Sequence, residues 1–75
     1  MPTLAQVIEE EASANGNLPD GFLYASFKNT GSSPASVNSV RLQPGEAKDF
    51  PFVGKGYEAI PFDPQASSLA IMFVI

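Results

Sequence analysis

The 75-residue sequence contains no cysteine and no histidine. Without cysteine, neither a disulfide nor a thiolate zinc site can form. Without histidine, the chain lacks the side chain that most often acts as a general base near neutral pH. Carboxylates and carbonyls remain as ligands for hard ions such as calcium, but no acidic loop has the spacing that such an ion requires. We therefore expect no metal, no cofactor, no small-molecule substrate and no enzymatic activity.

Basic residues are also scarce, since the chain has four lysine and arginine residues against eight acidic ones, for a net charge of −4. The whole excess falls in residues 1–20, where Glu9, Glu10, Glu11 and Asp20 have no basic counterpart. A nucleic-acid-binding protein concentrates its basic residues on one face, and acidic residues repel phosphate. Nucleic acid is therefore not an expected partner.

The chain also lacks a long apolar run. A membrane-spanning helix needs roughly 18 or more apolar residues, and no such stretch is present. The first residues lack the basic start and uninterrupted apolar stretch of a signal peptide, because three glutamates fall within them. We expect neither a membrane span nor a signal peptide.

What the sequence does have is a short unbroken apolar run at its end, Leu69-Ala70-Ile71-Met72-Phe73-Val74-Ile75. Side chains of a strand alternate between two faces, so both faces of this one need cover from the protein's own core or from another subunit. A chain this short buries only about 60% of its unfolded surface. Small domains compensate with disulfides, metals or oligomerisation, and the first two are excluded here. The run is therefore a candidate subunit interface.

Residues 4–14 have the spacing of one short amphipathic helix. Leu4, Val7, Ile8 and Ala12 lie near the positions i, i+3, i+4 and i+8 of one face. Asn15-Gly16 follows as a left-handed stop. At about eleven residues this helix needs a partner surface, either on its own domain or on another subunit. We interpret residues 1–21 as an acidic helical arm and linker.

From residue 22 onward the pattern becomes extended, with short strands separated by glycine and proline turns. Asn38-Ser39 fits a two-residue hairpin turn, and Pro44 and Gly45 fit the central positions of a type II turn. Pro51 and Pro61 suggest strands that lie at a sheet edge. The predicted strands cover residues 22–28, 35–37, 40–42, 47–52, 57–62 and 68–75.

Because no helix is expected between these strands, they favour antiparallel pairing. The sequence therefore predicts a mainly β protein, a small antiparallel β-sandwich or barrel of about five to six short strands with one N-terminal helix. Residues 22–75 form the β-domain. The last strand should be central in it or lie at a subunit interface, since an exposed strand of this kind would aggregate.

Two patterns with a catalytic look have simpler structural interpretations. Residues 54–59 read G-x-G-x-x-A, but Ile60-Pro61 follows where a dinucleotide-binding motif needs a helix, so we expect a hairpin turn. Asp49 and Glu58 lie on adjacent predicted strands, yet a chain of this length leaves little room for a sugar cleft. We interpret Asp49 and Glu58 as solvated charges on their strands.

Residues 22–75 resemble a recurrent β-module. An N-x-G strand end at Asn29-Thr30-Gly31 is followed by a short hairpin, the turn Leu42-Gln43-Pro44-Gly45-Glu46 and then Phe50. This arrangement is similar to segments of Ig-like sandwich modules and of small β-structured accessory proteins of bacteriophage virions. The segment is shorter than a full Ig domain, so the resemblance implies a reduced module that neighbouring subunits complete. It implies no functional residue.

Two functions remain open from the sequence. The first is a non-enzymatic structural or assembly protein in a symmetric oligomer, by resemblance a phage capsid or tail accessory subunit in the virion or in the host cytoplasm. Its partners would be further copies or a larger protein assembly, and its candidate interface residues are Leu4, Val7, Ile8, Leu69, Ile71, Phe73 and Ile75. The alternative is a monomeric binding module or protein inhibitor that acts through its Ser/Gly/Pro loops, chiefly residues 29–34 and 53–56.

Overall fold

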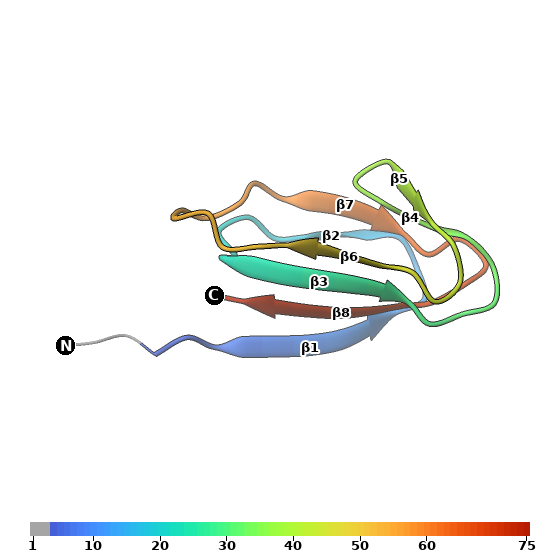
Figure 1. Cartoon of the computed structure of the whole chain (residues 1–75), viewed down its shortest axis with the longest axis horizontal. Helices are drawn as coiled ribbons and strands as arrows, with labels where there is room; N and C mark the ends of the chain where they lie inside the picture. The colour runs from blue at the N-terminus through green and yellow to red at the C-terminus, as the bar shows by residue number, and fades with distance from the viewer. Residues whose placement is uncertain (1–3) are drawn as a thin grey trace.

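The structure is a computed structural model that describes residues 4–75. It is a two-layered β-sandwich of eight strands (Figure 1). The strands are β1 (Val7–Ala12), β2 (Gly16–Leu18), β3 (Tyr24–Asn29), β4 (Ala35–Val37), β5 (Val40–Leu42), β6 (Ala47–Phe50), β7 (Ile60–Asp63) and β8 (Leu69–Val74). The mainly β prediction is confirmed, but the described chain has two more strands than the largest number expected and contains no helix.

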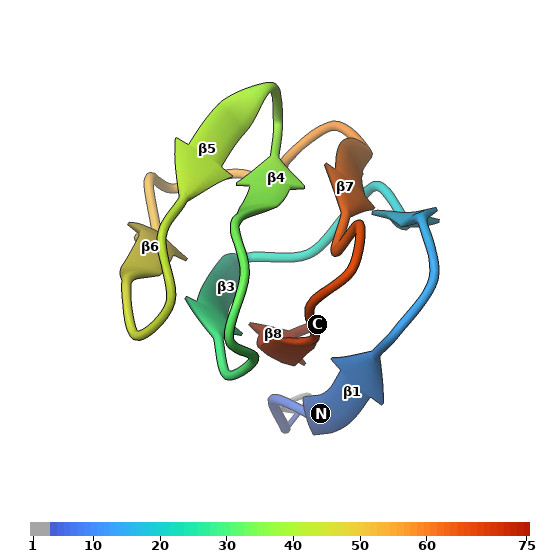
Figure 2. The same cartoon turned by 90° about the vertical axis from the view of Figure 1, so that its right-hand side faces the viewer.

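The strands follow a nested order. Sheet A has the order β1-β8-β3-β6 and sheet B the order β2-β7-β4-β5, and all pairs are antiparallel. The β4–β5 hairpin starts a long ribbon in which β3 pairs with β6, β2 with β7 and β1 with β8. All connections except the β4–β5 hairpin cross from one sheet to the other (Figure 2). A ribbon rolled in this way is a jelly roll, a double-sheet architecture made of two Greek keys.

The prediction of an N-terminal helix is wrong. Val7–Ala12 forms β1, which pairs along its whole length with β8, from Val7 opposite Val74 to Ala12 opposite Leu69. A helix of about eleven residues is marginal in water. The strand instead completes a hydrogen-bonded ladder and covers an edge of β8 that would otherwise promote aggregation. Gly16 likewise belongs to β2 and does not end a helix.

The last strand lies inside sheet A, between β1 and β3, as the sequence predicts for a strand that is apolar on both faces. Leu69, Ile71 and Phe73 point inward and are 0%, 2% and 6% exposed. The alternate residues of the same strand point outward and stay partly exposed. The inward half of β8 is therefore covered by the chain's own core.

Aromatic rings fill the space between the sheets. The ring of Phe27 in β3 lies edge-on to Phe50 at 5.8 Å and reaches Phe62 of sheet B at 6.0 Å. At one end of the core Phe22 stacks on Tyr57 at 5.0 Å, and the Tyr57 hydroxyl donates to a main-chain carbonyl at 2.6 Å. Each buried aromatic ring contributes about 1.5–3 kcal/mol relative to an exposed one, so this cluster carries much of the core stability.

Both predicted turns are present. Asn38 and Ser39 have φ angles of 50° and 65°, the conformation of a two-residue type I′ hairpin. Gly45 has a φ of 86°, and the Glu46 N–H donates to the carbonyl of Gln43 at 2.9 Å, as in a type II turn. These turns fix β4 and β5 at the residues predicted for them.

The sequence predicted an edge strand at both Pro51 and Pro61, and only the first prediction is confirmed. β6 is an edge strand of sheet A and ends just before Pro51, as expected. Pro61 lies in β7, which is flanked by β2 and β4, so its predicted edge position is wrong. Its carbonyl accepts the N–H of Asn38 at 2.8 Å, which places Pro61 opposite the β4–β5 turn. The missing proline N–H would face the Asn38 carbonyl, so the one bond that is lost falls at the turn just beyond the end of β4.

Candidate functional site

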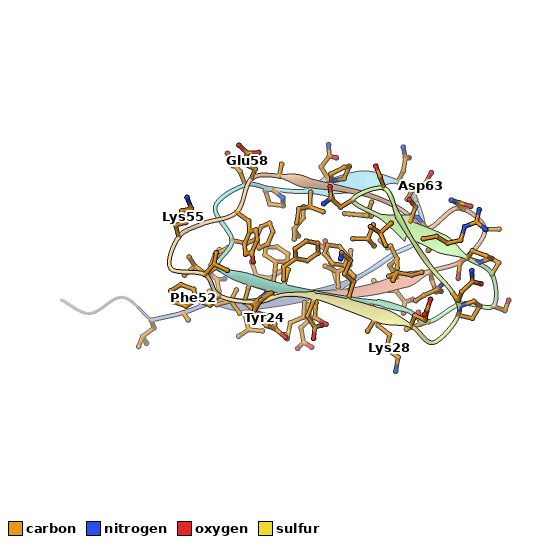
Figure 3. All side chains as sticks on the ribbon, turned by 45° about the horizontal axis from the view of Figure 1, so that its top comes forward. Tyr24, Lys28, Phe52, Lys55, Glu58 and Asp63 are labelled. Carbon is orange, nitrogen blue, oxygen red and sulfur yellow. The ribbon has the colours of Figure 1, made fainter. Side chains whose placement is uncertain are left out.

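The outward face of sheet A is the candidate site. The strand register places nine side chains on this face in three rows that cross β1, β8 and β3. The rows are Val7, Val74 and Tyr24; then Glu9, Met72 and Ser26; then Glu11, Ala70 and Lys28. Figure 3 shows Tyr24 and Lys28 on the same side of the sandwich. β8 forms the middle of the face.

Apolar residues occupy the middle of this face, where a sandwich normally presents polar ones. Ala70, Met72 and Val74 alternate with the core residues of β8 and are partly exposed. Val7 of β1 is 57% exposed, and Tyr24 of β3 is partly exposed beside Val74. We call Val7, Tyr24, Ala70, Met72 and Val74 the apolar strip. The solvent-facing half of β8 therefore stays partly exposed among residues 4–75.

Charged side chains border the apolar strip on opposite sides. A shallow groove runs over β8, with Glu9 and Glu11 on its β1 side, Lys28 on its β3 side, and Ala70 and Met72 between them. Two strand spacings, about 9–10 Å, separate the backbones of Glu11 and Lys28, with Ala70 between them. Acid and base are thus separated across an apolar centre.

One hydrogen bond extends the face toward the edge strand β6. The Ser26 hydroxyl donates to Asp49 Oδ1 at 2.9 Å, in the register that sets these two residues opposite each other. Ala47 lies opposite Lys28 on the same strand. The β3 side of the face therefore continues over β6 with one further acid and one small apolar residue.

The interface candidates from the sequence divide between core and surface. Leu69, Ile71 and Phe73 lie in the core, and Ile8 packs against it from β1. The remaining three, Leu4, Val7 and Ile75, are 87%, 57% and 46% exposed. Of the seven candidates only Val7 belongs to the apolar strip. The sequence analysis named the whole run 69–75 as a candidate interface, but its candidate residues in β8 were the inward Leu69, Ile71 and Phe73 and not the outward Ala70, Met72 and Val74.

The two loops proposed for a binding module differ. Residues 29–34 are tied to the sandwich, because buried Asn29 bonds to the backbone of Gly31 and Ser33. Residues 53–56 are exposed and follow Phe52, which is 64% exposed, and Val53 itself is 59% exposed. This loop lies at the end of the sandwich that holds the C terminus (Figure 1). Only the second loop presents apolar side chains to solvent.

The structure gives no support to the catalytic patterns. The G-x-G-x-x-A segment is followed by β7, and because β6 and β7 belong to different sheets it is a crossing loop and no hairpin. Asp49 lies on β6 of sheet A, whereas Glu58 lies in the loop before β7. No group of three or more acidic residues that could hold a metal ion occurs in residues 4–75. No helix in that range could cross a membrane.

Comparisons with protein-family models, with curated proteins and with solved structures found no significant match. The strand order by itself leaves the function open, because jelly rolls serve as viral capsid domains, as lectins and as cupins. A proposal about function must therefore be argued from the surface residues of the chain. Its distinctive feature is the apolar strip with acid on one side and base on the other.

Proposed function

We propose that this protein is a non-enzymatic structural subunit that assembles with further copies of itself. Its most specific setting is the virion of a bacteriophage, as a capsid or tail accessory protein. The observation that carries the proposal is the apolar strip on the outward face of sheet A. A monomer that leaves such a strip open exposes a surface typical of protein contact sites.

Two further features support the virion setting. Viral capsid domains are among the main users of the jelly roll, although this analogy of fold carries no functional residue. The segment from Asn29 through Phe50 also resembles accessory proteins of phage virions, and it contains one type I′ turn and one type II turn. Both features agree with a subunit whose task is packing.

Solution mass tests the proposal. Light scattering coupled to size exclusion, run from about 5 to 500 µM protein, should give a mass above the 7.9 kDa of one chain that rises with concentration. This is the expected result because a higher protein concentration raises the fraction of chains that are associated. A mass of 7.9 kDa at every concentration would contradict self-assembly.

The exposed loop before β7 favours a second function, a monomeric binding module. Phe52 and Val53 place two apolar side chains in solvent, which suits capture of a partner protein. This function applies if the chain is monomeric and a partner protein is recovered together with the wild-type chain. Replacing Phe52 and Val53 by serine should then remove binding to that partner protein. Val40→Ser on β5, where Val40 is 44% exposed, is the control and should leave that binding unchanged.

A further inference from the structure

The outward face of sheet A has a pattern that suits one particular partner. In two of the three rows the β1 residue and the β3 residue are complementary across β8: Val7 with Tyr24, and Glu11 with Lys28. Apolar residues meet apolar ones, and an acid meets a base. In the middle row Glu9 lies across from Ser26, whose hydroxyl already donates to Asp49. Within one chain β8 separates the two residues of each row by two strand spacings. A second copy that reverses the order would set each residue directly opposite its counterpart.

We propose that sheet A packs face to face against sheet A of a second copy, about a twofold axis that runs along β8. This proposal rests on the structural function proposed above and names the partner and the face of that assembly. The axis sets β1 of one copy over β3 of the other, so Glu11 of each copy lies opposite Lys28 of its mate. Met72 and Val74 then meet their own symmetry mates at the centre. A twofold contact of this kind is isologous and closes on itself.

The charges disfavour the other ways of pairing two copies through this face. An axis that crosses the strands would stack β1 on β1 and set Glu9 and Glu11 against the same glutamates. Edge pairing of two β1 strands would also gather the six carboxylates of Glu9, Glu10 and Glu11. Like charges that lie opposite each other destabilise paired strands and sheets, so the acids act against these arrangements.

The edge of β1 is otherwise open to pairing. The N–H of Gln6 donates to the Ile75 carbonyl and the N–H of Ile75 donates to the Gln6 carbonyl, both at 3.0 Å. Because backbone groups alternate sides along a strand, those of Val7, Glu9 and Glu11 face away from β8. Charged side chains on such an edge are a common protection against pairing. The acids therefore block the edge and leave the face available.

The size of the face predicts a weak dimer. The strands of the face are at most six residues long and lie four abreast, so the face measures about 20 × 19 Å, well below the roughly 800 Å² per partner of a standard interface. Aligned sheets pack about 10 Å apart and cross at about 30°. We expect a dissociation constant of about 1–100 µM.

Asp49 is a charge on this face that opposes the arrangement. On β6 it lies one strand beyond Ser26, so in the dimer it approaches Glu9 of the mate. Two carboxylates at that spacing repel each other and weaken the contact. Asp49→Asn should therefore tighten the dimer by several-fold, while the hydrogen bond from Ser26 can persist to the amide oxygen.

Charge reversal on the full chain tests the proposal, with sedimentation equilibrium as the measurement. Lys28→Glu and Glu11→Lys should each weaken the dimer at least about 10-fold, because each turns two attractive pairs into repulsive ones. The double variant restores both pairs with opposite sign and should return to within about threefold of wild type. Lys55→Glu on the exposed loop before β7 makes the same change in net charge away from the face and is the control. Glu11 and Lys28 are exposed, so a circular dichroism melt should show that each variant stays folded.

The outcomes separate this proposal from the function on which it rests. Rescue by the double variant, with Lys55→Glu unchanged, supports the face and the axis. An oligomer that ignores both single reversals overturns this proposal and leaves the structural function standing. A wild-type chain that stays monomeric at every concentration overturns both.

Discussion

Replacing Asn29 by leucine should bring the protein close to unfolding. Asn29 is the buried polar residue of the core, with no exposed surface. Its amide nitrogen donates to the carbonyls of Ser33 at 2.8 Å and Leu42 at 3.0 Å. Its amide oxygen accepts from the N–H of Gly31 at 3.0 Å and from the Ser67 hydroxyl at 2.7 Å. One side chain thus joins the β3–β4 loop, the end of β5 and the β7–β8 loop.

The magnitude follows from these four bonds. A hydrogen bond contributes about 1 kcal/mol net, and a buried partner left without one costs about 1–3 kcal/mol. Leucine has the same branching as asparagine, but its methyl groups cannot approach polar atoms as closely as these hydrogen-bonded groups do, so overpacking adds to the loss of polar contacts. We expect Asn29→Leu to lower the free energy of unfolding by about 3–5 kcal/mol. A chain of this length has only about 4–11 kcal/mol in total.

Urea unfolding followed by far-ultraviolet circular dichroism measures this loss. With a slope of about 1 kcal/mol per molar urea, the midpoint should fall by about 3–5 M, or the variant should be unfolded without urea. Asn17→Ala, at an exposed position of β2, is the control and should stay within about 0.5 kcal/mol of wild type. A midpoint shift below about 1 M for Asn29→Leu would refute the view that this residue holds the loops together.

Two backbone positions give further predictions, and the same urea assay measures both. Gly31→Ala should lower the free energy of unfolding by about 2–4 kcal/mol, because its Cβ would lie 2.8 Å from the backbone nitrogen of Ser68; exposed Ser32→Ala is the control and should be neutral. Ser39→Gly should raise it by about 0.5–1 kcal/mol, since Ser39 holds a φ of 65° that glycine adopts without strain. A lower midpoint for Ser39→Gly would contradict the type I′ assignment.

The parts of the fold that the sequence predicted well are those fixed by local chemistry. β4 and β5 occur at the predicted residues because Asn38 and Ser39 tolerate positive φ and so set the hairpin. The turn at Gly45 is predictable for the same reason, since proline and glycine each suit one central position. Local preferences of this kind need no knowledge of the rest of the chain.

The two N-terminal strands could not be found in that way. In β1, Ile8 and Ala12 face the core, and their spacing of four residues suits a helix as well as a strand. Three successive glutamates also have low strand propensity. What decides the conformation is pairing with β8, about sixty residues later in the chain. That choice is non-local, and so is the position of Pro61 in an inner strand.

The apolar part of the candidate site could be predicted from the sequence, but the arrangement of charges around it could not. The run from Leu69 to Ile75 showed that both faces of β8 need cover, and the structure places one face in the core. Which face goes inside follows from size, because Leu69, Ile71 and Phe73 fill more volume than the outward set that contains Ala70. The apolar run by itself carried no charge, so the pairing of acid and base across it required the register of β1 and β3.

β8 contributes to stability and to the candidate interface through opposite faces of the same six residues. A truncation of this strand would therefore remove the core and the apolar strip together, and loss of assembly in such a variant would carry no information about the interface. The charged residues at the border are different, because Glu11 and Lys28 are exposed and make no contribution to the core. Their reversal changes only what a second copy would meet. The separation of acid from base by one apolar strand is what makes assembly testable here without disturbing the fold.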